Sequence, residues 1–245
     1  MPLRAFGPIF GQVYGDGDPG IVALHGWARR GADFDRVLDG LDAVAFDLPG
    51  FGASPAPTVA TGAAGYAAAV VEALDVVGGG PFVLVGHSFG GRVAVVIAST
   101  RPELVKGVVL SGVPLIRRGS AAGPSLGYRL MRRANRIGLV SDERMERERR
   151  SRGSADYRAA SGVMRDVLVT VVNESYENEL GGISCPVALV WGADDTDVPV
   201  AVAEAARELL SEAGVDVTLE VVADVGHFTP TLAPAALRAA IERVS

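Results

Sequence analysis

The sequence predicts an α/β protein built around a mostly parallel sheet. Short runs of β-branched and apolar residues recur along the chain, and Ala-rich amphipathic stretches lie between them. The runs are nearly continuous in hydrophobicity rather than alternating, which is typical of strands buried on both faces. Strand and helix in alternation predict right-handed βαβ units. The predicted strands are residues 21–26, 43–50, 82–88, 105–112, 186–192 and 217–224.

The stretches between the strands predict helices on both faces of this sheet. Their apolar residues recur at helical spacing, and alanine, a strong helix former, is frequent in them. Before the first strand of the parallel series, "LRAF" and "GQVY" predict a hairpin at one sheet edge. The predicted helices are residues 62–77, 89–101, 200–213 and 234–243.

One segment interrupts the alternation. Residues 114–178 contain no strand-like run apart from the ambiguous "VLVTVV" at 167–172. The segment carries 13 Arg against 8 acidic residues, a net charge of +5, whereas the rest of the chain carries −11. We therefore predict a core of residues 1–113 and 179–245, with residues 114–178 inserted as an Arg-rich helical lid.

Composition limits the functional class. The chain has 245 residues, 49% of them hydrophobic, and its formal charge of −6 argues against a general nucleic-acid binder. Cys185 is the only cysteine, so no internal disulfide forms and a reducing compartment is favoured. No run approaches the roughly 18 apolar residues of a membrane span, and the first residues lack a secretory signal. We expect a cytoplasmic protein without nucleic-acid or membrane partners.

Ser88 is the candidate nucleophile. It lies in "GHSFG", residues 86–90, between a predicted strand and a predicted helix. A serine needs a base and a group that stabilises the oxyanion, and a sharp strand-to-helix turn presents both its hydroxyl and the next backbone N–H. Glycines two positions before and after relieve crowding in such a turn. The alternative is a capping serine in a glycine-rich turn.

The chain contains three histidines that could act as the base. His87 adjoins Ser88, but neighbours on a turn diverge, so we expect it to point away from the hydroxyl. His25 follows a strand in "LHGW", where we expect it to brace the loop by hydrogen bonds. His227 follows the last strand in "VGHFTP" and is the candidate general base.

Three aspartates could orient this imidazole. Asp194, Asp195 and Asp197 all follow a strand in "WGADDTDVP", and carboxyl ends of strands are where such sheets place their sites. Proximity does not choose among them. The alternative is that they cap the helix beginning near Pro199.

The chain resembles α/β-hydrolases over essentially its whole length. The order Ser88, Asp195, His227 matches the nucleophile, acid, histidine order of that superfamily. The family's acid commonly stands in a Gly-x-x-Asp-x-x-x-Pro pattern, which Gly192 and Pro199 match, so the resemblance selects Asp195. It implies an α/β-hydrolase fold and a Ser-His-Asp triad.

Two further motifs match the family. "LHGW" resembles its His-Gly oxyanion loop, which implies backbone N–H donors from Trp27 and Phe89. "DLPGFGAS" at 47–54 resembles its Asp-x-x-Gly-x-Gly turn, in which Asp47 has a structural role. We expect Trp27 and His87 to contact the substrate as well.

The resemblance implies a serine hydrolase that cleaves carboxylic esters through an acyl-enzyme, on a small-molecule substrate. It requires no metal or cofactor, and the sequence shows no zinc-type spacing. Lactonases and C–C bond hydrolases share the same triad. In another class, a ligand receptor or signalling protein can retain a triad and act by changing shape.

The arginines of the predicted lid suggest a substrate class. Some have helical i,i+4 acidic partners, but others have none nearby, so a basic lid could steer an anionic substrate. Lid and "HGW" together resemble the biotin-pathway esterases that demethylate a pimeloyl thioester on an acyl carrier protein. The plainer alternative is codon bias towards arginine on a solvated lid. The pairs are Glu143–Arg147, Glu146–Arg150 and Glu148–Arg152, and the arginines without local acids include Arg117, Arg118, Arg129 and Arg158.

Overall fold

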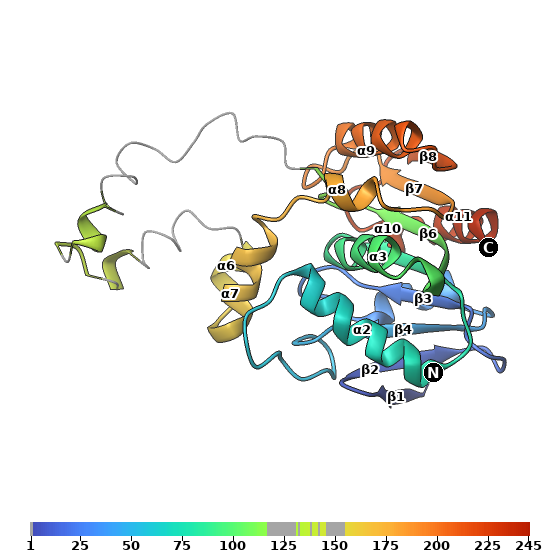
Figure 1. Cartoon of the computed structure of the whole chain (residues 1–245), viewed down its shortest axis with the longest axis horizontal. Coiled ribbons are helices and arrows are strands. Elements are labelled where there is room, and N and C mark those ends of the chain that lie inside the picture. The colour runs from blue at the N-terminus through green and yellow to red at the C-terminus, as the bar shows by residue number, and fades with distance from the viewer. Residues whose placement is uncertain (1, 117–130, 132, 138, 142, 146–154) are drawn as a thin grey trace.

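The core of the protein is one eight-stranded sheet, in the order β1-β2-β4-β3-β5-β6-β7-β8 (Figure 1). The computed structural model describes residues 2–116, 131, 133–137, 139–141, 143–145 and 155–245. The strands are β1 Leu3–Phe6, β2 Ile9–Tyr14, β3 Ile21–Leu24, β4 Ala43–Asp47, β5 Phe82–His87, β6 Val105–Ser111, β7 Val187–Gly192 and β8 Val217–Val222.

The pairing confirms the mostly parallel sheet. β1 and β2 form the predicted antiparallel hairpin at one edge, and β2 also pairs antiparallel with β4. Every other pair of neighbouring strands is parallel. All residues of β4, β5 and β7 are buried, as their continuous hydrophobicity predicted. The prediction was wrong for β8, whose residues are half-buried or exposed, because it is the other edge strand and has a neighbour on one side alone.

Helices cover both faces of the sheet. One face packs against α2, α3, α8 and α9, and the other against α1 and α11, which gives two separate apolar clusters. The four predicted helices are α2, α3, α9 and α11, each within two residues of its predicted bounds. The sequence had not indicated the short helices. The bounds are α1 Asp35–Leu38, α2 Ala63–Val77, α3 Phe89–Thr100, α8 Glu177–Leu180, α9 Val200–Glu212, α10 Thr229–Leu232 and α11 Pro234–Val244, with 3-10 turns at Gly31–Phe34 and Pro102–Leu104.

The connection between β6 and β7 contains helices α6 Ala155–Ala159 and α7 Gly162–Val171 as well as α8. The ambiguous run at 167–172 is therefore mostly helical. Figure 1 shows α7 beside α2, and the hydroxyl of Tyr66 on α2 lies 3.9 Å from the sulfur of Met164 on α7. The predicted pairs that include Arg147, Arg150 and Arg152 lie outside the described residues, as do Arg117, Arg118 and Arg129.

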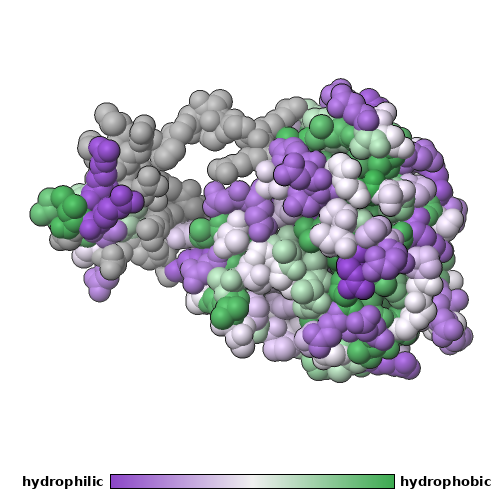
Figure 2. Space-filling view, in the orientation of Figure 1, coloured by the Kyte–Doolittle hydropathy of each residue, from purple (hydrophilic) through white to green (hydrophobic). Residues whose placement is uncertain are grey.

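The described surface has a mixed character. Figure 2 shows hydrophilic and hydrophobic residues interspersed over the face that carries α2, α3 and α9. Within the described part of the chain, no helix is long and apolar enough to span a membrane.

Candidate active site

Ser88 lies at a sharp turn between β5 and α3. Its backbone has φ 49° and ψ −114°, a conformation that glycine adopts easily and that a serine adopts under strain. The Ser88 N–H donates to the carbonyl of Ser111 at 2.9 Å, which ties the turn to the neighbouring strand β6. The strand–turn–helix context that the sequence predicted is therefore present.

The glycines of this turn are required by close backbone contacts. A Cβ on Gly86 would lie 2.4 Å from the Cα of Gly91, and a Cβ on Gly90 would lie 2.1 Å from the carbonyl oxygen of Leu24. Real Cβ atoms do not approach backbone this closely. The first turn of α3 can thus pack against β3 and β5 only if both positions lack side chains.

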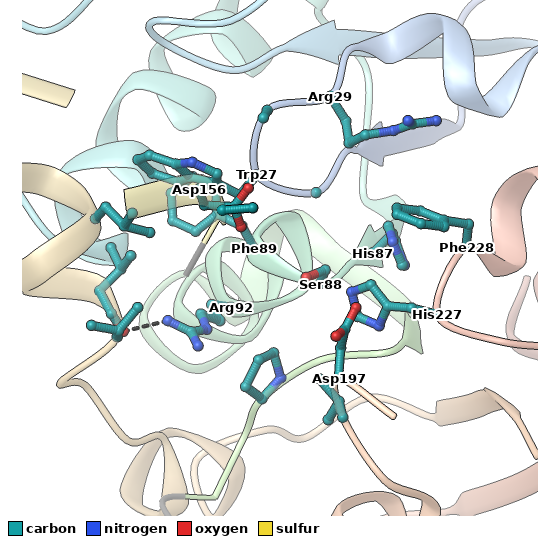
Figure 3. Close-up of a pocket in the computed structure, with 18 residues that line it drawn as sticks. Trp27, Arg29, His87, Ser88, Phe89, Arg92, Asp156, Asp197, His227 and Phe228 are labelled. Carbon is teal, nitrogen blue, oxygen red and sulfur yellow. Dashed lines mark hydrogen bonds between the residues drawn. The ribbon is translucent and has the colours of Figure 1, made fainter. Parts of the chain in front are cut away.

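His227 and Asp195 come from the loops after β8 and β7 and are joined by a hydrogen bond. His227 Nδ1 donates to Asp195 Oδ2 at 2.8 Å, and Asp195 Oδ1 accepts the backbone N–H groups of Asp197 and Val198 at 3.0 and 2.8 Å. With Nδ1 as the donor, Nε2 is left as the proton acceptor. Figure 3 shows the imidazole turned towards Ser88, and both residues line one pocket.

The structure separates the three candidate aspartates. Asp195 is buried at 5% exposure, while Asp194 and Asp197 are exposed. The N-cap of α9 is Pro199, and no side chain caps this helix. The alternative that these aspartates cap the helix is therefore excluded. The carboxylate that bonds to His227 belongs to Asp195.

His25 is fully buried behind the loop that follows β3. Its Nδ1 donates to the carbonyl of Gly26 at 2.7 Å, and its Nε2 accepts the N–H of Leu48 at 2.9 Å. Burial lowers the pKa of His25 to about 4, so the ring is neutral. These two hydrogen bonds agree with the prediction that His25 braces the loop. Asp47 holds the same region, because it accepts the N–H groups of Gly31 and Ala53, both at 2.8 Å.

His87 was expected to point away from the Ser88 hydroxyl, and neither of its ring nitrogens makes a hydrogen bond to Ser88. Its ring lies 4.9 Å from the ring of His227, centroid to centroid, and lines the pocket beside Ser88. His87 Nδ1 donates to the Ser111 carbonyl at 3.0 Å, and burial followed by the nearby His227 lowers its pKa to about 3.

An aromatic cluster that the sequence did not reveal joins the "HGW" loop to the start of α3. The ring of Trp27 packs edge-to-face on Phe51 and Phe89, at 4.9 and 5.5 Å between centroids, and Tyr66 packs on Phe89 at 4.8 Å. The first N–H groups of a helix have no partner within it. The cluster therefore fixes the loop that carries the Trp27 amide against the helix end that carries the Phe89 amide.

These residues surround a pocket of about 600 Å³. One wall comes from loops at the strand ends, and the other comes from the β6–β7 connection (Figure 3). The strand-end wall contains Gly26, Trp27, Ala28, Arg29, His87, Ser88, Phe89, Arg92, Asp197, Val198, His227 and Phe228, and the connection wall contains Pro114, Ala155, Asp156, Leu168, Val171 and Val172.

Two arginines of this pocket were not singled out from the sequence. Arg29 pairs with Asp33 and lies 5.0 Å from the ring of Phe228, which is 44% exposed at the mouth. Arg92 lies in α3, where the one charge in the apolar run "FGGRVAVVIA" was a signal that could have been used.

Within the described chain, one group of side chains has the atoms to hold a metal ion: Asp195, Asp197 and His227, whose ligand atoms lie within 4.8 Å of one another. The atoms of Asp195 and His227 that approach most closely already share a hydrogen bond. This arrangement suits proton transfer, since a bound cation would compete for the same lone pairs.

Comparison with known proteins identifies relatives of this chain. The model of the alpha/beta hydrolase family matches residues 21–240. A 2-hydroxy-6-oxononadienedioate/2-hydroxy-6-oxononatrienedioate hydrolase from Burkholderia vietnamiensis is 30% identical over 225 residues, covering 76% of this chain and 74% of that protein. A pimeloyl-[acyl-carrier protein] methyl ester esterase from Chromobacterium violaceum is 39% identical over 108 residues, 42% of this chain. Several curated relatives are matched over 36–39% of their own length.

Solved structures share the fold. Est816, an N-acyl homoserine lactone degrading enzyme, superposes with a TM-score of 0.71 at 22% identity, over 99% of both chains. A similarity at this level of identity establishes the architecture alone.

Proposed function

The chain belongs to the α/β hydrolase family, and we propose that within it the protein is a serine hydrolase that cleaves carboxylic esters through an acyl-enzyme. The observation that carries the proposal is the hydrogen bond from His227 Nδ1 to the buried Asp195, in the pocket that Ser88 also lines. The bond sets the tautomer in which Nε2 can accept the Ser88 proton.

The reaction follows from these positions. Ser88 Oγ attacks the ester carbonyl as His227 takes its proton, and the tetrahedral intermediate then expels the alcohol, which receives that proton. Water activated by the same imidazole releases the acid and restores the serine. Asp195 stabilises the imidazolium in both steps.

The developing oxyanion needs hydrogen-bond donors that are already in place. We assign this role to the backbone N–H groups of Trp27 and Phe89, which the aromatic cluster holds together. Such a donor contributes on the order of 3 kcal/mol to transition-state stabilisation. Trp27 and His87 line the same pocket, which supports the proposal that they contact the substrate.

A methyl ester on a carrier-bound acyl chain is the more specific form of the proposal. It is supported by the name of the Chromobacterium violaceum relative and by the excess of arginine in residues 114–178, our proposed lid. An acidic acyl carrier protein would be attracted by such a segment.

Lactone or C–C bond hydrolysis is the alternative, because the relatives include a dienedioate hydrolase and the structural neighbours a lactone-degrading enzyme. All three reactions use the same serine, base and oxyanion donors, so they differ in the substrate that fits the pocket.

The test is turnover of p-nitrophenyl butyrate, a methyl ester, a lactone and a vinylogous diketone by wild type and Ser88→Ala. We expect the esters to be hydrolysed fastest, and Ser88→Ala to lose at least about 10⁴-fold in kcat. After treatment with a fluorophosphonate, mass spectrometry of the digested protein should find the label on one peptide, the one that contains Ser88. Turnover that survives in Ser88→Ala, or a dominant lactone or diketone activity, would overturn the assignment.

A further inference from the structure

Arg92 is a buried charge beside the candidate nucleophile. It lies in α3, whose other residues are small, apolar or hydroxylated, and its side chain is only 8% exposed while forming part of the pocket wall. Burying a cation is costly unless acceptors surround it. A guanidinium at this position therefore calls for an acceptor that offsets the cost of burying it.

The contacts of Arg92 leave its charge without a carboxylate. Nη1 donates to the carbonyl of Val171 at the end of α7, and the guanidinium carbon lies 5.9 Å from the ring centre of Tyr176. Within the described residues, Nε is buried and has no acceptor, and no ion pair includes Arg92. A guanidinium has five donors arranged to match a carboxylate.

Glu174 does not fill this role. Its Oε2 accepts the Tyr176 hydroxyl at 2.6 Å and the N–H of Ala63 at 3.1 Å, so it is engaged at the start of α2. Burial lowers the pKa of Arg92, while attraction by Tyr176 and Glu174 and hydrogen bonding to Tyr176 oppose that effect. The side chain stays cationic at neutral pH.

We propose that Arg92 binds a carboxylate carried by the substrate, so that the enzyme selects esters of short carboxylated compounds. The inference rests on the hydrolase function proposed above and adds a specificity-determining residue to it. Residues 88 and 92 are separated by about 6 Å along the helix axis, so one small molecule can reach both. Figure 3 shows Arg92 and Ser88 along the same side of the pocket.

The other charges of the pocket have different surroundings. Asp156 and Asp197 are exposed, where water screens their repulsion of an anion. Arg29 is about one-third exposed and already paired with Asp33. Of the described residues that line the pocket, Arg92 is the buried arginine, and it forms no ion pair.

The experiment compares esters matched in length that differ in charge. Monomethyl glutarate and monomethyl adipate carry the carboxylate on the acyl part, butyryloxyacetate carries it on the alcohol part, and methyl pentanoate and ethyl butyrate are neutral. We expect wild type to prefer one carboxylated series by about tenfold or more in kcat/KM. The preferred series identifies which half of the substrate faces Arg92.

Arg92→Met should lose about 10- to 100-fold in kcat/KM on that series, mostly through KM, and change less than threefold on the neutral esters. Arg92→Lys should restore part of the preference. Arg101→Met removes an exposed arginine at the other end of α3 and should change nothing. Thermal melting of each variant reports whether the bond to Val171 matters for stability.

Equal turnover of charged and neutral esters by wild type would overturn the inference, as would a parallel loss on both in Arg92→Met. If no ester is hydrolysed, the proposed function fails, and the inference is then decided by binding. Glutarate should raise the melting temperature of wild type and Ser88→Ala but not of Arg92→Met, and pentanol should raise none of them. Absence of this glutarate effect in wild type would reject the carboxylate site itself.

Discussion

One wall of the pocket is formed by loops at the ends of sheet strands, and the other by the β6–β7 connection, and their residues are held differently. Asp195 is fixed by hydrogen bonds within its own loop, and Ser88 is fixed by a backbone hydrogen bond to β6. In the connection wall, Leu168 and Val171 are buried, but Val172 is 55% exposed, and Ala155 and Asp156 are also exposed. We infer that the strand-end wall determines the chemistry and, through Arg92, the charge of the substrate, while the connection wall adjusts the length of substrate that fits.

The largest effect should come from the acid. Asp195→Asn keeps the size of the side chain but favours the imidazole tautomer with its proton on Nε2, so kcat should fall by about 10⁴-fold. Steady-state ester kinetics measure this. Asp197→Asn, on the exposed side of the same turn, is the matched control and should stay within threefold. Similar losses in both variants would show that the two acids act together.

Gly90→Ala should damage folding. The new Cβ would meet the Leu24 carbonyl, and separating α3 from β3 should cost about 3 kcal/mol of unfolding free energy. Urea denaturation measures it. Gly20→Ala places a Cβ where nothing lies within 4 Å and should be nearly neutral. A stable Gly90→Ala would mean that the elbow is not held by this contact.

The loop behind the strand-end wall, which His25 braces, should also respond to acid. The pKa of His25 is about 4 in the folded protein, below the ordinary value near 6.5, so between these values the unfolded chain binds the extra proton. Unfolding free energy should therefore fall as the pH drops from 6.5 to 4, with His25 contributing about 1.4 kcal/mol per pH unit. Denaturation at several pH values should show a shallower slope for His25→Asn. An unchanged slope would contradict the assignment.

The smallest effect should come from the connection wall. Val172→Ala enlarges the pocket at an exposed position, so stability should change by less than about 0.5 kcal/mol. The ratio of kcat/KM for octanoate over butyrate esters should rise about threefold. A loss of turnover on both substrates would instead place this residue in the catalytic machinery.

The sequence predicted those parts of the molecule that depend on local pattern. Continuous apolar runs identified the strands, and the Gly-x-Ser-x-Gly spacing identified the turn at Ser88, because both signals lie within a few neighbouring residues. Asp195 was distinguished from Asp194 and Asp197 by family resemblance alone, since burial decides between them and spacing does not reveal burial.

Features that arise from packing between distant segments were not predicted. The aromatic cluster brings together residues from two loops and two helices, and Arg92 meets Val171 across the interior. His87 is held by the carbonyl of Ser111 on the neighbouring strand β6. Each of these contacts joins segments that are distant in the sequence, so it cannot be predicted before the order of the strands in the sheet is known.

The positive φ of Ser88 has a consequence for directed evolution. Glycine at this position would adopt the same backbone without strain, which for a non-glycine residue costs about 1–3 kcal/mol. Libraries screened for heat resistance alone should therefore enrich glycine at position 88 and yield sturdier, inert molecules, so such a screen needs a turnover assay beside it.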